Sequence, residues 1–264
     1  MEMNCNQCQE AAKGIGCTVF GVCGKSPELS ALMDTFIYSL IGLSSLAVEA
    51  KKLEINTEEI DLFVIEGLFA TITNANFDEE EFVSRIQASI NYREQYKALL
   101  QEKGIVLPSA AIYELDVKTK EEMIHKALHL AIHQTADEDI RSIRELMLFG
   151  LKGLAAYLSH AEKLNYKNEA LFSAAHEFMA SLVNDELTLE QYVPMTLALG
   201  EVGVQAMALL DEANTTTFGN PEISTVEIGV GTRPGILITG HDLHDLKQLL
   251  EQTKDQGIDI YTHS

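Results

Sequence analysis

Basic residues are scarce in this chain of 264 residues, which has 19 Lys and Arg against 40 Asp and Glu. The formal net charge is therefore −21 at pH 7. Nucleic acids and anionic membranes attract proteins through clustered Lys and Arg, so the deficit argues against both as partners. We interpret the acidity as a solubilising surface. With 46% hydrophobic residues, the chain can still bury a sizeable core.

Signals for export and for membrane insertion are also lacking. The N-terminal stretch MEMNCNQCQE has no basic residue before an apolar segment, so we expect no secretory leader and a cytoplasmic location. The longest apolar run, FIYSLIGLSSLAVEA from Phe36, is interrupted by serines and is too short to span a bilayer. We predict that it forms a buried core helix and that the protein has no membrane partner.

Tryptophan is absent and Tyr and Phe are few, whereas Leu, Ala and Glu are abundant, a composition that favours helix. Seven helix starts are indicated by capping residues, at Ser26, Thr57, Asp78, Thr119, Asp137, Asn168 and Thr188. The first helix should end near Leu53 and the last near Ala213. Short polar turns between them predict a mainly α fold with two bundles of three-helix type in residues 27–218.

The pattern changes after TTTFGNPE, where Thr, Gly and Pro mark a boundary. GILITG (235–240) predicts a short strand, HDLHDLKQLLEQTKDQG an amphipathic helix, and IDIYTHS a second strand. Residues 219–264 are therefore expected to begin an α/β, Rossmann-like domain. Because a parallel sheet of two strands has no stability of its own, we expect either that the chain is part of a longer protein or that this tail packs against another body.

No cysteine occurs after residue 23, so the four thiols Cys5, Cys8, Cys17 and Cys23 are crowded into the first tenth of the chain. Disulfides are disfavoured because the cytosol keeps thiols reduced. Zinc accepts pairs of the form C-x2-C, although its usual sites have a longer spacer between the pairs. An iron–sulfur cluster fits the spacing C-x2-C-x8-C-x5-C better, with zinc as the alternative.

The residues around these cysteines carry a resemblance. CNQCQEAAKGIGCTVFGVCGK resembles the N-terminal signature of the hybrid-cluster proteins, also called prismane proteins or hydroxylamine reductases. The similarity continues at GLKGLAAYLSHA (150–161) and at FGNPEISTVEIGVGTRPGILITGHDLHDLKQLLEQT, in the order of the family. The resemblance implies that residues 1–26 are an iron–sulfur loop in which Cys5, Cys8, Cys17 and Cys23 bind a [4Fe–4S] cluster.

The resemblance also implies an activity, which is the two-electron reduction of hydroxylamine to ammonia and water in the nitrogen metabolism of an anaerobe. Nitric oxide is the other substrate that the family suggests, and a redox protein would be the electron donor. His241, in the GHDL motif, is implied to be a catalytic ligand of an iron in the hybrid [4Fe–2O–2S] cluster. Taken without the resemblance, a histidine at this strand–helix edge is more often a capping or solvent-facing residue.

The further glutamate and cysteine ligands that the family uses for the hybrid cluster do not occur in this chain. We therefore expect the hybrid cluster only in a full-length protein, and no hydroxylamine reduction by these 264 residues alone. The alternative hypothesis is a non-catalytic [4Fe–4S] electron-transfer module, and a third is a zinc-stabilised interaction domain.

Other histidines are predicted to have no catalytic role. His125, His129 and His133 recur at intervals of four residues, which puts neighbours on one helix face. We interpret them as an exposed polar stripe, since no further metal ligand is evident. His160, followed by Glu162, is predicted to serve packing or to lie at the surface.

Overall fold

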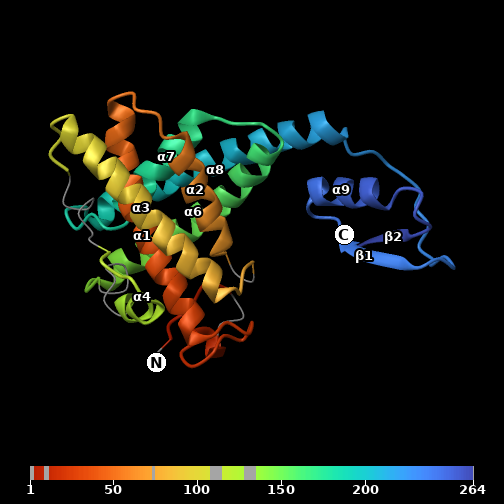
Figure 1. Ribbon diagram of the computed structural model, residues 1–264, viewed down its shortest axis with the longest axis horizontal. Helices are drawn as coiled ribbons and strands as arrows, with labels where there is room; N and C mark the ends of the chain where they lie inside the picture. The colour runs from red at the N-terminus through yellow and green to blue at the C-terminus, as the bar shows by residue number, and fades with distance from the viewer. Residues whose placement is uncertain (1–2, 9–11, 73–74, 108–114, 128–134, 264) are drawn as a thin grey trace.

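Helices make up most of the chain in the computed structural model, which describes residues 3–8, 12–72, 75–107, 115–127 and 135–263 (Figure 1). A short 3-10 turn, η1 (Ala12–Gly14), lies in the cysteine segment. The helices are α1 (Pro27–Lys52), α2 (Glu58–Ala70), α3 (Glu79–Glu102), α4 (Lys120–Ala127), α6 (Glu138–Lys163), α7 (Glu169–Ser181), α8 (Leu189–Phe218) and α9 (Leu243–Thr253). Two strands, β1 (Gly235–Thr239) and β2 (Asp259–His263), follow α8 in the sequence. The predicted fold, mainly α with the start of an α/β unit, is confirmed.

Capping side chains begin most of the helices as predicted, but Thr57 before α2 makes no side-chain cap hydrogen bond. Ser26 Oγ accepts a hydrogen bond from Leu29 N at 3.0 Å at the start of α1. Before α4, Thr119 N donates to Glu122 Oε2 at 3.1 Å and Glu122 N donates to Thr119 Oγ1 at 3.2 Å. Such contacts satisfy backbone N–H groups that have no partner within the helix. Side chains also cap three other helices, at Asp78, Asp137 and Asn168.

The predicted end of the last long helix was wrong. We expected α8 to stop near Ala213, but it continues to Phe218. The Thr215 hydroxyl donates to Asp211 O at 2.7 Å, so this β-branched residue is accommodated inside the helix. The helix ends at Gly219, whose φ of 92° lies in a region that L side chains rarely adopt.

Helix α1 lies at the centre of the helical part. It packs against α2, α3, α4 and α7, while α6 packs against α2, α7 and α8, and one hydrophobic cluster joins both groups. The apolar run from Phe36 is buried in α1, as predicted. At the contact with α2, a Cβ on Gly67 would lie 2.8 Å from the Phe36 ring, so only glycine allows this approach.

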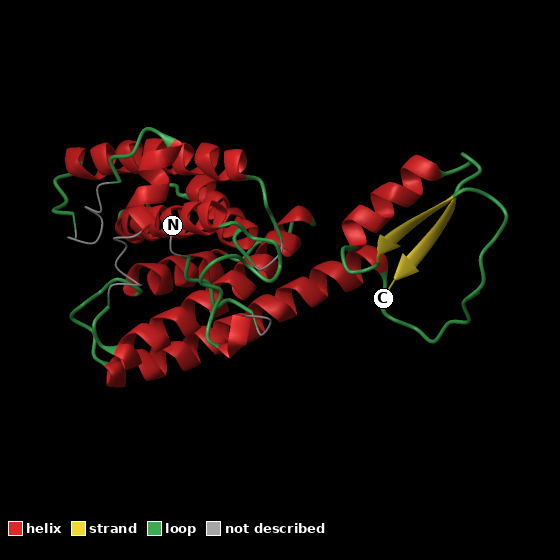
Figure 2. Cartoon of the chain, turned by 90° about the horizontal axis from the view of Figure 1, so that it is seen from below, coloured by secondary structure: helices red, strands yellow, loops and turns green. Residues whose placement is uncertain are grey.

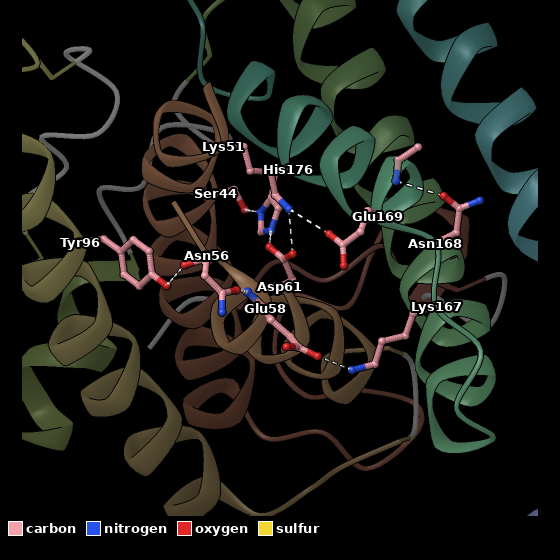
Figure 3. A network of polar contacts seen from close by, with 11 residues as sticks. Ser44, Lys51, Asn56, Glu58, Asp61, Tyr96, Lys167, Asn168, Glu169 and His176 are labelled. Atoms are coloured by element: carbon pink, nitrogen blue, oxygen red, sulfur yellow. Dashed lines mark hydrogen bonds and ion pairs between the residues drawn. The ribbon is translucent and has the colours of Figure 1, made fainter. Parts of the chain in front are cut away.

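A buried polar network joins α1, α2 and α7 (Figure 3). His176 Nε2 lies 2.8 Å from Asp61 Oδ1, and His176 Nδ1 lies 3.0 Å from Ser44 Oγ. Lys51 Nζ also donates to Asp61 Oδ2 at 2.8 Å. The order Ser–His–Asp is that of a hydrolytic triad, but Ser44 is 0% exposed, so no substrate can reach its hydroxyl. The network therefore stabilises the packing of three helices.

Two helices, α1 and α8, are long and apolar enough to cross a membrane by length and composition alone. In α1, 89% of the most apolar window is buried within the protein, as expected of a core helix. In α8 the corresponding value is 11%, and Leu197 and Val204 are exposed on its outer face. Core helices of soluble proteins pass the same test, so it gives only weak evidence for a membrane span.

The C-terminal part is a small β–α–β unit (Figures 1 and 2). Strands β1 and β2 pair in parallel, from Gly235 opposite Asp259 to Thr239 opposite His263. Ahead of β1, Arg233 forms an ion pair with Asp259. The parallel pairing agrees with the predicted strand–helix–strand pattern. Figure 1 shows this unit at the far end of the molecule from the N-terminal segment.

The structure describes only part of the predicted histidine stripe. His125 is exposed on α4, whereas His129 and His133 lie outside the described residues. His160 is partly exposed on α6, with its ring centroid 5.2 Å from that of Phe69. Its surface and packing role agrees with the prediction.

The polar network predicts a pH-dependent contribution to stability. Burial by itself raises the pKa of Asp61, but hydrogen bonds and positive charge from His176 and Lys51 outweigh it and lower that pKa below its ordinary value. A lowered folded-state pKa stabilises the fold fully above the unfolded-state pKa, which is about 4. The stabilisation is then lost as the pH falls through the folded-state pKa.

Asp61→Asn should lower the free energy of unfolding by about 3 kcal/mol at pH 7, because it leaves the ammonium group of Lys51 and the ring of His176 without their carboxylate partner. The difference from the unchanged protein should shrink as the pH falls below about 4. Urea denaturation followed by circular dichroism at several pH values measures this. Glu58→Gln is the control, because Glu58 pairs with Lys167 at the surface and should contribute less than about 1 kcal/mol. Equal effects of the two substitutions at pH 7 would contradict the prediction.

Candidate metal centre

The main chain brings two of the four cysteines opposite each other. Cys5 N donates to Cys17 O at 3.1 Å, and Cys17 N donates to Cys5 O at 2.8 Å, which forms an isolated antiparallel bridge. Met3 N adds a further bond to Thr18 O at 3.3 Å. Residues far apart within the loop are thereby fixed in register before any metal binds.

A tight turn positions the last cysteine, Cys23. Gly21 N donates to Lys25 O at 2.8 Å, and Gly24 N donates to Gly21 O at 2.9 Å. A Cβ on Gly21 would lie 3.1 Å from both the backbone N and O of Lys25. Glycine is therefore needed at position 21, where the turn closes directly onto the start of α1.

All four cysteines are free thiols. Cys17 is the most enclosed, with 5% of its surface exposed, while Cys5, Cys8 and Cys23 are half-buried. Hydrogen bonds from the backbone N–H groups of Val22 and Ala12 lower the pKa of the Cys17 thiol, with a smaller contribution from Lys25. Burial opposes these effects without cancelling them. The surroundings of Cys17 therefore favour the thiolate, which is the form that binds metals.

Two buried lysines lie behind this loop. Lys25 and Lys152 are each 2% exposed, which is rare for a lysine without an anionic partner. Lys152 Nζ donates to Gln7 Oε1 at 3.0 Å and to Thr71 O at 3.2 Å. Burial lowers the pKa of Lys152 to about 7; the nearby charges of Asp34 and Cys5 act in the opposite direction.

Lys25 has no such acceptors. Within the described part of the chain, neither a carboxylate nor a hydrogen-bond acceptor pairs with its ammonium group. Its positive charge acts on Cys17 and on Lys152, so it lies close to the thiols. A buried ammonium group without a partner is costly, and an anionic group held by the cysteines would supply the missing charge.

The sulfur positions bear on which group the site would hold. In a mononuclear zinc site, four sulfurs at the usual bond length lie about 3.8 Å apart. Among the described residues, no three cysteine sulfurs all lie within 4.8 Å of one another. A cluster of several irons needs wider spacing and four thiolates, so the donor set and the buried ammonium groups fit an iron–sulfur cluster.

His241 lies elsewhere, in the turn between β1 and α9, and is exposed. Together with Asp242 it lines a cavity of about 260 Å³ whose other wall is formed by α6 and α8. Across it, His160 Nδ1 lies 3.4 Å from Asp242 Oδ2. The structure does not bring His241 to the four cysteines (Figure 1).

Three side chains near His241 have the geometry of a metal site, but their arrangement is explained by the cap of α9. Potential ligand atoms of Asp242, His244 and Asp245 lie within 4.8 Å of one another. Asp242 Oδ1 already accepts from Asp245 N at 3.0 Å as the N-cap of α9. Helix capping therefore accounts for this cluster.

Sequence reasoning missed the two buried lysines. The signals were present, because Lys25 lies two residues after the last cysteine and Lys152 interrupts the small and apolar residues of GLKGLAAYL. What the sequence does not reveal is that Gln7 and Lys152, 145 positions apart, are hydrogen-bonded.

Comparison with known proteins agrees with the resemblance of the two motifs. Residues 3–264 match the Prismane/CO dehydrogenase family. The chain is 47% identical over 268 residues to a hydroxylamine reductase of Thermoanaerobacter pseudethanolicus, covering 100% of this chain and 48% of the relative. It is 46% identical over 291 residues to that of Clostridium tetani, covering 100% and 51%, and 46% identical over 270 residues to that of Parabacteroides distasonis, covering 99% and 48%.

The chain thus spans about half the length of the curated relatives it matches. The match nevertheless extends over nearly all of its own residues, including the cysteine loop, the helices and the β–α–β unit. This protein therefore belongs to the Prismane/CO dehydrogenase family.

Proposed function

We propose that Cys5, Cys8, Cys17 and Cys23 bind one [4Fe–4S] cluster, and that the chain belongs to an oxidoreductase that reduces hydroxylamine. One observation carries the cluster proposal: the loop that contains every thiol of the chain is backed by two buried lysines, in a protein with a net charge of −21. That charge arrangement suits an anionic cluster held by thiolates. The names of the relatives supply the proposed substrate.

Each part of the loop has a definite task in this proposal. A bound [4Fe–4S] cluster supplies one-electron transfer. The Cys5–Cys17 bridge holds two ligands in register, and the backbone N–H groups near Cys17 stabilise its thiolate. Residues 1–26 would then form the cluster-binding unit, residues 27–218 the helical support, and residues 219–264 the beginning of an α/β domain.

His241 is proposed as an iron ligand of the substrate-reducing hybrid cluster of a full-length protein. Its position supports this role, since ligands of open α/β sheets bind at the carboxyl ends of the strands, and His241 follows β1 directly. Its exposed imidazole leaves a nitrogen free to bind a metal. Hydroxylamine is the proposed substrate and nitric oxide the second candidate, with a redox protein as electron donor.

The proposed setting is the cytoplasm, and neither nucleic acid nor a membrane is proposed as a partner. The deficit of Lys and Arg and the burial of α1 support this setting. Metabolism of nitrogen compounds in an anaerobe follows from the proposed substrate and is part of the same proposal.

The alternative function is an electron-transfer module without catalysis. The observation that favours it is the separation of His241 from the cysteine loop, which leaves His241 without cysteine ligands among the described residues. Both functions require the [4Fe–4S] cluster, so turnover with hydroxylamine distinguishes them.

Cys17→Ser should remove most of the cluster, because Cys17 is the most enclosed ligand and its sulfur receives the backbone hydrogen bonds. Anaerobic reconstitution of the unchanged protein should give about four irons and four sulfides per chain. Iron and acid-labile sulfide analysis measures both, with Ser45→Ala in α1 as a control distant from the loop. Full iron and sulfide content in Cys17→Ser would refute the ligand assignment, and bound zinc without sulfide would refute the cluster.

His241 can be tested in a chimera of residues 1–264 followed by the second half of the Thermoanaerobacter pseudethanolicus relative. With a reduced viologen dye as donor, the chimera should reduce hydroxylamine, and His241→Ala should lower the rate at least about 100-fold, since second-shell changes alone cost up to that much. His244→Ala, in the first turn of α9, should keep most of the activity. Equal rates for His241→Ala and His244→Ala would contradict the proposal.

A further inference from the structure

The two buried lysines behind the cysteine loop suggest a role beyond support of the fold. We propose that Lys25 and Lys152 are positioning residues that raise the reduction potential of the bound cluster. The proposed ligands of that cluster are Cys5, Cys8, Cys17 and Cys23. The inference rests on the proposed function, because it concerns the cluster that these thiolates would bind.

Lys25 contributes a charge that no side chain compensates among the described residues. It lies between the last cysteine and the first helix, and its residue surface is 2% exposed. In the portion described, no carboxylate pairs with its ammonium group. The cysteines lie close to this charge, since Lys25 is two residues after Cys23 and its charge acts on Cys17.

Lys152 contacts the same loop through a hydrogen bond. It comes from α6, and its Nζ bonds to Gln7, the residue directly before Cys8. It also lines a cavity of about 40 Å³ together with Cys5, Asp34 and Glu145. Those two acids face the cavity too, but no described carboxylate lies within ion-pair distance of Lys152 Nζ.

The direction of the effect follows from electrostatics. In the one-electron step the oxidised cluster takes one electron from a reductant, and its charge becomes more negative by one. A fixed positive charge therefore stabilises the reduced form more than the oxidised form and raises the potential. The effect is large only where water does not screen it, and both amino groups are withdrawn from water. Because burial lowers the pKa of Lys152 to about 7, this side chain carries its full charge only below that pH, so the potentials are compared at about pH 6.

The experiment compares Lys25→Met and Lys152→Met with the unchanged chain after anaerobic reconstitution. Methionine keeps much of the side-chain volume and removes the charge. Each oxidised cluster is titrated with dithionite in the presence of redox mediators, and the appearance of the reduced cluster is followed by electron paramagnetic resonance. The matched control is Lys13→Met, which removes an exposed charge from the same loop.

Each buried-lysine substitution should lower the equilibrium constant for reduction about tenfold or more, which is 59 mV or more for a one-electron couple. Lys13→Met should change it less than about threefold. The charge-retaining variants Lys25→Arg and Lys152→Arg should recover most of the potential, which a purely structural role would not predict.

The outcomes separate the two proposals. If the unchanged chain takes up no iron and sulfide, the proposed function fails. If the cluster forms and both methionine variants keep the potential of the unchanged chain, this inference alone is overturned. Lys152→Met could unfold α6, which loss of the helical circular dichroism signal would reveal. In that case Lys25→Met, which lies outside the helices, decides: an unchanged reduction potential in this variant overturns the inference.

Discussion

Burial of two lysines, Lys25 and Lys152, behind a loop with four cysteines is the constraint that governs the proposed cluster site. Thiolates repel one another, and this chain has a net charge of −21. Placing Lys25 and Lys152 in the interior behind the loop offsets that repulsion locally. The same burial is costly while the site lacks an anionic cluster, so the binding of such a cluster should also stabilise the fold.

The helical body is what holds these charges in place. Lys25 lies directly before α1, the central helix, and Lys152 is on α6, which packs against α2, α7 and α8. A continuous hydrophobic core keeps α1 and α6 in one rigid arrangement, and the network around His176 and Asp61 fixes α1 against α2 and α7. Packing at a distance from the loop thus determines the electrostatic surroundings of the four thiols.

Local sequence signals predicted much of this architecture. The features that they did not predict depend mainly on contacts between residues far apart in the sequence. Ser26 and Thr119 marked helix starts because capping depends on residues three or four positions apart. The end of α8 was misplaced because three threonines suggested a boundary that Gly219 provides instead. The cysteine set was evident from spacing and resemblance. The hydrogen bond between Gln7 and Lys152, and the contact between Asp61 and His176, join segments more than 100 positions apart and have no signature in either segment.

The central claim is that the four cysteines hold an iron–sulfur cluster against the two buried lysines. Crystals of the anaerobically reconstituted protein, with diffraction data collected on both sides of the iron and zinc absorption edges, test it most directly. The account predicts one multi-iron peak of anomalous density bounded by Cys5, Cys8, Cys17 and Cys23, with the ammonium groups of Lys25 and Lys152 facing it. A single zinc peak among these sulfurs, or iron bound away from them, would contradict the account.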